Sequence, residues 1–226
     1  MATNNPKAKE ALQKEKINET VSKTELFFNE NKKIIYGAII AILVIGLGIL
    51  AINQWVIKPK QAEAMEQMFP AETAFNAQAY ELALNGDGNT LGFNDIIDEY
   101  GAKAGKAVYL YAGICDLQLG NFEQAIDNLK KYKGKESILA ARALACIGDA
   151  YVGLEDYGTA ISYFEKAAAK ADNIFAGAYL LKAGVAYEEL GQNDKALACY
   201  KQIKDKYPQS VEGYDIDKYI TRIESK

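Results

Sequence analysis

Residues 107–130 read AVYLYAGICDLQLGNFEQAIDNLK. The stretch contains two small residues 12 positions apart, and the pair recurs twice further along the chain: Gly113/Ala125, Gly148/Ala160 and Gly184/Ala196. Successive glycines of these pairs are 35 and then 36 residues apart. Two antiparallel helices joined by a short turn can cross closely only if each presents a residue with little or no side chain at the contact. The period therefore predicts an all-α stack of helical hairpins without strands.

The first helix of each hairpin is expected to end at a Leu-Gly or Leu-Glu step, after which an aromatic or apolar residue begins the packing of the second helix. These steps are Leu119-Gly120, Leu154-Glu155 and Leu190-Gly191. The pattern resembles the tetratricopeptide repeat, a helical hairpin of about 34 residues. The resemblance implies an α-solenoid over residues 106–226. It would consist of three units, at about 106–140, 141–176 and 177–209, and a C-terminal capping helix.

Residues 58–105 are expected to form connecting and capping helices, as a divergent repeat ahead of the regular ones. One helix is predicted over about 61–84 and a loop over 85–89. A short helix follows, with apolar residues at i, i+3, i+4 and i+7: Phe93, Ile96, Ile97 and Tyr100.

A second decisive stretch lies nearer the amino end, where residues 34–52 read IIYGAIIAILVIGLGILAI and carry no charge. A helix of this length rises roughly 28 Å, about one hydrocarbon thickness of a bilayer. We therefore predict a single transmembrane helix over 34–57. Its flanks carry basic and aromatic residues suited to the two headgroup layers: Lys32, Lys33, Tyr36, Trp55 and Lys58.

The distribution of lysine predicts the orientation of this helix. Five lysines precede it within 20 positions and two follow it, Lys58 and Lys60. Positive residues stay on the cytoplasmic side, so residues 1–33 are expected to form a charged cytoplasmic tail. No small-x-small cleavage site follows the apolar run, which indicates a retained anchor rather than a signal peptide. In a bacterial inner membrane the repeats would then be periplasmic.

The amino-acid composition excludes several kinds of catalytic and metal site. The chain has no His, so it cannot form Ser-His-Asp or Cys-His triads or His-ligated metal sites. The Asn85-x-Asp87-x-Asn89 loop lacks the glycine and the glutamate that a calcium loop needs. A net charge of -4 gives no basic surface for nucleic acid. We therefore predict no enzyme activity, no cofactor, no metal, no nucleic acid and no small-molecule substrate.

The three cysteines, Cys115, Cys146 and Cys199, have no metal-ligand spacing and are expected to be buried as small apolar residues. The sequence leaves open whether Cys115 and Cys146, on adjacent units, form a disulfide.

The resemblance to tetratricopeptide repeats implies that the first helix of each unit lines a concave groove for a protein partner. The positions so mapped are Leu110, Tyr111, Ile114 and Leu117 in the first unit, Arg142, Cys146, Asp149 and Val152 in the second, and Leu181, Lys182, Val185 and Glu188 in the third. Such a groove suits an amphipathic helix or an extended apolar segment. The alternative is that the upstream helix at 91–100 already covers the four positions of the first unit.

A further resemblance concerns the segment before the anchor. Phe27-Phe28-Asn29-Glu30-Asn31, directly ahead of a single membrane helix that leads into repeats, looks like the ancillary subunit family of the bacterial Sec translocon. That resemblance implies a role in protein export, with translocon subunits and periplasmic chaperones as partners. The alternative is a structural scaffold of a cell-envelope or division complex.

Overall fold

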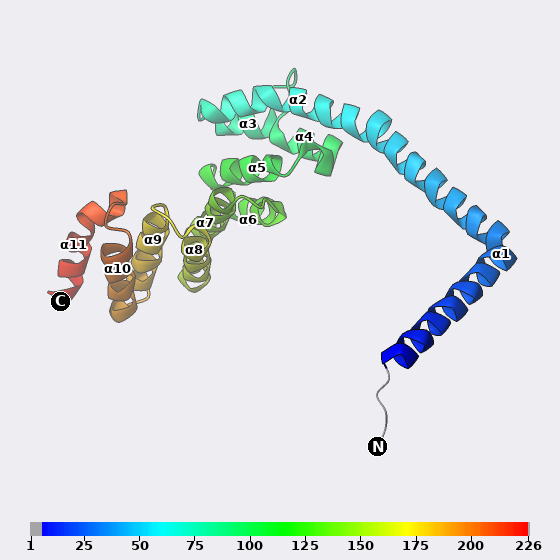
Figure 1. The fold of residues 1–226 in the computed structure, drawn as a ribbon. Coiled ribbons are helices and arrows are strands. Elements are labelled where there is room, and N and C mark those ends of the chain that lie inside the picture. Colours follow the sequence, from blue (N-terminus) through cyan, green and yellow to red (C-terminus); the bar gives the residue numbers. More distant parts are fainter. Residues whose placement is uncertain (1–5, 226) are drawn as a thin grey trace. The chain divides into compact units, whose positions relative to one another are not determined.

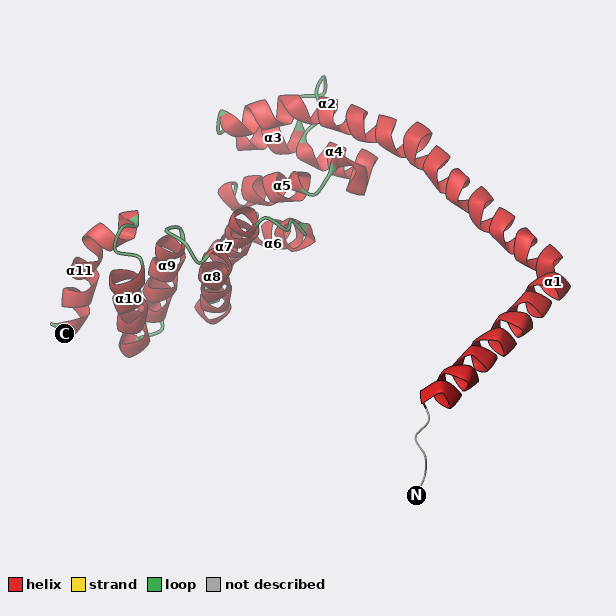
Figure 2. Cartoon of the chain, in the orientation of Figure 1, coloured by secondary structure: helices red, strands yellow, loops and turns green. Residues whose placement is uncertain are grey.

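The computed structural model describes residues 6–225, and within them the chain is helical with no strand (Figure 2). The chain divides into two compact units, Met1–Lys58 and Pro59–Lys226. Each is described by itself.

The first unit is one long helix, α1 (Pro6–Ile52), followed by a π-helical turn, η1 (Asn53–Ile57). The side chains of the apolar run face outward: Ile42 is 69% exposed and Leu47 is 65% exposed. Among the described residues, the helical stretch Glu30–Asn76 is the one long and apolar enough to cross a membrane, and its apolar window has 0% of its residues buried. Within the described part of this unit, nothing buries the apolar side chains of the window.

The second unit is a stack of helices joined by short turns (Figure 1). It opens with α2 (Lys58–Asn76), α3 (Tyr80–Asn85), α4 (Phe93–Tyr100) and a 3-10 turn, η2 (Gly101–Ala104). Three hairpins and a final helix follow: α5 (Ala107–Gln118) with α6 (Phe122–Lys131), α7 (Ser137–Gly153) with α8 (Tyr157–Ala171), α9 (Ala176–Glu189) with α10 (Asn193–Lys206), and α11 (Val211–Glu224).

The predicted small residues lie at the helix crossings. In the middle hairpin, a Cβ built on Gly148 of α7 would lie 2.6 Å from a ring carbon of Phe164 of α8. Ala160, the partner of Gly148 in the repeat, is 0% exposed. The other two hairpins place Gly113 against Leu129 and Gly184 against Tyr200 in the same way. The glycine of each pair therefore meets a real steric requirement. The succession of helical hairpins, with no strand among the described residues, confirms the predicted fold class.

The turn inside each hairpin reverses the chain through one residue with positive φ: Gly120 at 81°, Glu155 at 60° and Gly191 at 67°. The next amide closes the turn onto the helix just ended, as when the Gln192 amide donates to the Tyr187 carbonyl at 2.9 Å. This is the geometry expected of a helix that stops in the left-handed region. Glycine at two of the three positions avoids the steric cost that Glu155 bears.

The prediction of one helix over 61–84 is wrong. Gln78 has φ of 59°, and the Ala79 amide donates to the Ala74 carbonyl at 2.9 Å, so α2 ends and the chain folds back into α3. The reversal places Ala83 and Leu84 of α3 in the same buried cluster as Ala71 of α2. The chain gains a buried interface that a single straight helix would leave exposed. No glycine marks this turn, which is why the sequence conceals it.

Candidate interaction groove

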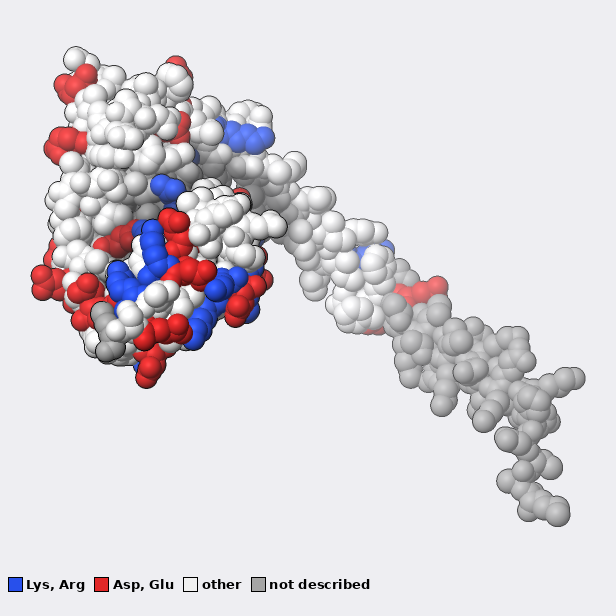
Figure 3. All heavy atoms as spheres, turned by 90° about the vertical axis from the view of Figure 1, so that its left-hand side faces the viewer, with Lys and Arg blue, Asp and Glu red and all other residues white. Residues whose placement is uncertain are grey.

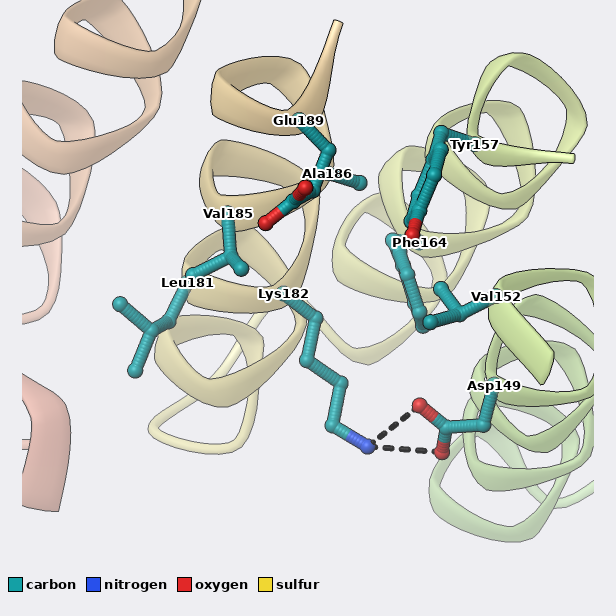
Figure 4. Close-up of a pocket in the computed structure, with 9 residues that line it drawn as sticks. All are labelled: Asp149, Val152, Tyr157, Phe164, Leu181, Lys182, Val185, Ala186 and Glu189. Atoms are coloured by element: carbon teal, nitrogen blue, oxygen red, sulfur yellow. Dashed lines mark hydrogen bonds and ion pairs between the residues drawn. The ribbon is translucent and has the colours of Figure 1, made fainter. Parts of the chain in front are cut away.

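The repeat domain carries a groove between α7 and α9, with α8 forming its floor (Figure 4). Its volume is about 360 Å³. Nine residues line it: Asp149, Val152, Tyr157, Phe164, Leu181, Lys182, Val185, Ala186 and Glu189.

The middle of the groove is apolar. Phe164 is only 1% exposed because it packs against Gly148, yet one part of its ring forms the floor. Val185 of α9 is 40% exposed above it, which is high for an aliphatic side chain. Val152 of α7 faces it from the other wall (Figure 4). A partner side chain that covered Val185 would remove this apolar surface from water, at roughly 25 cal/mol per Å².

One end of the groove is closed by an ion pair that joins its two walls. Lys182 Nζ of α9 donates to both carboxylate oxygens of Asp149 of α7, each at 2.7 Å. The same Nζ lies 5.8 Å from the ring centroid of Phe164. The side chains of Lys182 and Asp149 are 44% and 30% exposed, so the pair adds at most about 1 kcal/mol to stability. Its role in the groove is to fix a polar boundary beside the apolar floor.

The opposite end of the groove carries a carboxylate and a phenol. Figure 4 shows Glu189 and Tyr157 at this end, away from Lys182 and Asp149. No basic side chain among the described residues forms an ion pair with Glu189. The arrangement can therefore accept an apolar side chain in the middle and a hydrogen-bond donor or a cation at the Glu189 end.

Comparison with known proteins identifies the helical hairpins. Residues 141–169 and 178–210 match family models described as tetratricopeptide repeat. The hairpins α7–α8 and α9–α10 therefore match the tetratricopeptide repeat. Two solved structures, a "Crystal structure of MamA" and a "Crystal structure of MamA protein", share the fold, with TM-scores of 0.51 and 0.52 at 16% identity each. The alignments cover 69% and 74% of this chain and 92% and 88% of the other chains. No curated protein matches the sequence.

The tetratricopeptide repeats bring together part of the set of groove residues expected from sequence. Asp149, Lys182 and Val185 line one groove, and Val152 and Leu181 join them. Tyr157 and Phe164 also line it, but they come from the second helix of their repeat and are not among the positions expected from sequence. The spacing could have pointed to Phe164, because it lies 16 residues after Gly148, at the position that Leu129 and Tyr200 occupy in the neighbouring repeats.

The residues expected from the first repeat do not line this groove. Leu110 and Ile114 are 4% and 6% exposed, in one buried cluster with Ala143 and Ile147 of α7. They are core residues because α7 packs onto α5 and α6 at this point.

The remaining two first-repeat positions are also covered. Tyr111 stacks on Phe93 of α4, with ring centroids 5.5 Å apart, and its ring lies 5.0 Å from that of Phe75 of α2. Leu117 is partly buried against the cluster that holds Leu110. The alternative that the upstream helix covers this repeat therefore holds for Tyr111, which contacts α4. Leu110 and Ile114 are instead buried in a cluster with residues of α7.

Three further mapped positions lie outside the groove lining. Arg142 is exposed on α7 and Cys146 is buried. Glu188 accepts hydrogen bonds from the Tyr200 hydroxyl and from Arg222 of α11, so it ties the last repeat to the final helix.

The three cysteines of the repeats are free and buried, and Cys115 and Cys146 are not bonded to each other. Desolvation raises the pKa of Cys115 to about 12, and the nearby Asp116 carboxylate adds to the shift. Burial likewise raises the pKa of Cys146 and of Cys199 to about 11. These thiols resemble buried apolar side chains rather than nucleophiles.

We therefore expect N-ethylmaleimide at pH 8 to modify the folded protein on the order of a hundredfold more slowly than the urea-unfolded protein. The reason is that a thiol whose pKa is raised holds less thiolate at pH 8, and the helices shield the sulfur. Mass spectrometry of timed samples measures the modification. Rapid labelling of any one cysteine in the folded chain would show that its helix opens.

Proposed function

We propose that this chain is a membrane-anchored protein-interaction module whose repeats lie on the periplasmic side of a bacterial inner membrane. The repeats are protein-interaction modules by family, and the groove between α7 and α9 is the surface we assign to the partner. The observation that carries the proposal is the fully exposed apolar helix ahead of the repeats. A bilayer would cover this surface, and anchoring would raise the effective concentration of the groove for partners held at the same membrane.

The flanks of the apolar helix support the anchored state. Lys32 and Lys33 are exposed ahead of it, and Trp55 is 78% exposed just beyond it. Lysines and a Trp at the ends of an apolar run match the two headgroup layers of a membrane. Tyr36 and Lys58 complete these flanks. The excess of lysine before the run favours an amino end in the cytoplasm.

The partner we propose belongs to the protein-export machinery: a subunit of the Sec translocon or a periplasmic chaperone working beside it. Support comes from the resemblance of residues 27–31, ahead of the anchor, to the ancillary translocon subunits. A groove that is apolar in the middle and polar at both ends suits a helix or an unfolded segment with an apolar anchor residue.

A photo-crosslinking amino acid in place of Val185, in intact cells, tests this function. Val185 is exposed and central in the groove, so we expect ultraviolet light to join it to translocon subunits or chaperones. The matched control places the same amino acid at Ala198, an exposed position of α10 outside the groove, where we expect no such product. Recovery of division or envelope-assembly proteins instead would favour a scaffold and contradict the export role.

The same cells test the orientation. External protease added to spheroplasts is expected to degrade the repeats and to leave the amino-terminal tail intact. Degradation of the tail with intact repeats would show the opposite orientation and would contradict the proposed periplasmic location of the repeats.

A further inference from the structure

A concentrated set of lysines surrounds the connection between α6 and α7. Residues 129–136 read LKKYKGKE, with lysine at positions 130, 131, 133 and 135. Lys106, at the start of α5, joins them because its Nζ donates to the carbonyl oxygen of Lys133 at 3.0 Å. This local excess of positive charge contrasts with residues 58–226, which carry 19 basic and 25 acidic residues.

The backbone of this connection explains how the lysines come to face solvent. The chain is extended at Tyr132 and at Glu136, with ψ of 117° and 121°. Alternate side chains of an extended segment point to opposite sides. Tyr132 turns inward and is 9% exposed, and its ring covers Gly134, where a Cβ would collide with the phenol. Lys133 and Lys135, on either side of Gly134, are exposed.

Two hollows flank Tyr132, and each has lysines at its rim. One, of about 420 Å³, is lined by Lys106 and Lys135 and by Leu139, whose side chain is 41% exposed. The other, of about 300 Å³, is lined by Lys130 and Lys133 over an apolar wall that includes Leu144. Each hollow thus combines positive charge with apolar surface.

These lysines differ from the lysines at the other end of the domain. In α10 and α11, Lys201, Lys204 and Lys218 pair with Glu224, Asp217 and Asp215 at 2.9, 2.7 and 3.0 Å. Figure 3 shows such mixing of positive and negative residues on the face toward the viewer. By contrast, within the described residues no carboxylate forms an ion pair with any lysine around Tyr132.

Apart from the hydrogen bond of Lys106 to the Lys133 carbonyl, the contacts that these lysines make are long. Lys130 Nζ lies 3.5 Å from the Tyr151 hydroxyl and 5.9 Å from the centre of its ring. Lys131 Nζ lies 6.0 Å from the centre of the Tyr109 ring. Glu136 lines the first hollow and is the single acid of residues 129–136. Four lysines with one acid over eight residues raise the local positive potential, which attracts a negatively charged ligand.

We propose that this surface, defined by Lys106, Lys130, Lys133, Lys135, Tyr132 and Leu139, is a second binding site that takes an acidic, apolar-containing segment of a partner protein. Carboxylates of the segment pair with the lysines, and its apolar side chains enter the hollows on either side of Tyr132. Two separate apolar hollows favour a peptide over a lipid headgroup, because a headgroup would use the charge and leave the hollows empty. The site is separate from the groove between α7 and α9 and does not depend on the function assigned to that groove.

The test uses the full chain in dodecyl maltoside and a fluorescent peptide of alternating Glu and Leu. We expect saturable binding that weakens as salt rises. Lys133→Gln/Lys135→Gln should weaken binding about tenfold and reduce its salt dependence. The matched control, Lys204→Gln/Lys218→Gln, removes the same charge from paired lysines and should stay within about twofold of the wild type. A second variant, Leu139→Ser, changes an exposed apolar wall without touching charge and should also weaken binding. Circular dichroism verifies that each variant is folded.

Several outcomes would overturn the proposal. They are no saturable binding of the Glu/Leu peptide, an equal loss in the control variant, and equal binding of a peptide of alternating Glu and Ser, which lacks apolar side chains. A membrane arm uses the chain in phosphatidylcholine vesicles. If these vesicles capture phosphatidylglycerol vesicles through Lys133 and Lys135 while the Glu/Leu peptide fails to bind, the surface recognises anionic lipid and not a protein.

Discussion

With Val44→Arg/Leu47→Arg, the chain is expected to leave the membrane fraction. Twelve of the 19 residues at 34–52 are Ile, Leu or Val. At about -0.3 to -0.6 kcal/mol each, they favour insertion by roughly -4 to -7 kcal/mol. Each arginine near the centre of the span costs about 2.5 to 3.5 kcal/mol, so two of them cancel the gain. Carbonate extraction of membranes, followed by centrifugation, should find the wild type in the pellet and the variant in the supernatant.

A control variant separates the loss of anchoring from a general effect of added charge. Val211 and Tyr214 are 82% and 79% exposed on α11, in the repeat domain. Val211→Arg/Tyr214→Arg adds the same charge there and should remain in the pellet. If carbonate extracts the wild type, or if Val44→Arg/Leu47→Arg stays in the pellet, residues 34–52 do not span the bilayer and the proposed anchor is wrong.

The sequence predicts the hairpins because their requirements are local. Gly148 must be small since Phe164 lies against it, and the turn residue seven positions beyond Gly148 must reverse the chain. Both requirements recur with each repeat, so the period makes them visible even where individual residues vary. Glu155 occupies a turn position where its counterparts are glycine, and the turn still forms.

The groove is harder to predict because it depends on how neighbouring repeats are packed. Leu110 and Val185 both lie on the first helix of a repeat, but Leu110 is 4% exposed and Val185 is 40% exposed. α7 covers Leu110, whereas the space between α7 and α9 leaves Val185 open. The distance between these helices follows from contacts of residues far apart in sequence, and no single repeat encodes it. The turn at Gln78 is hard to predict for a related reason, since the packing of α3 against α2 stabilises it.

Phe164→Ala is expected to lower the free energy of unfolding of the repeat domain by about 3–5 kcal/mol. Phe164 is 1% exposed, it fills the space beside Gly148, and it also forms the floor of the groove. Its removal would leave a cavity at the crossing of α7 and α8. Gly148, on the facing side, has no side chain that could fill this cavity. Urea unfolding of the full chain in neutral detergent, followed by circular dichroism, measures the change. Leu154→Ala, at a position 38% exposed in the adjoining turn, should cost less than about 1 kcal/mol.

A substitution at Gly148 tests whether the contact between Gly148 and Phe164 itself accounts for this stability. Gly148→Ala places a methyl group against the Phe164 ring and should cost about 1–3 kcal/mol through overpacking, offset by up to about 1 kcal/mol of better helix propensity. Phe164→Leu shortens the opposing side chain, so the added methyl group should be tolerated better in the double variant than the two single changes predict. Energies that simply add would mean that Gly148 and Phe164 do not share one crossing. The need for a small residue at position 148 would then lose its physical basis.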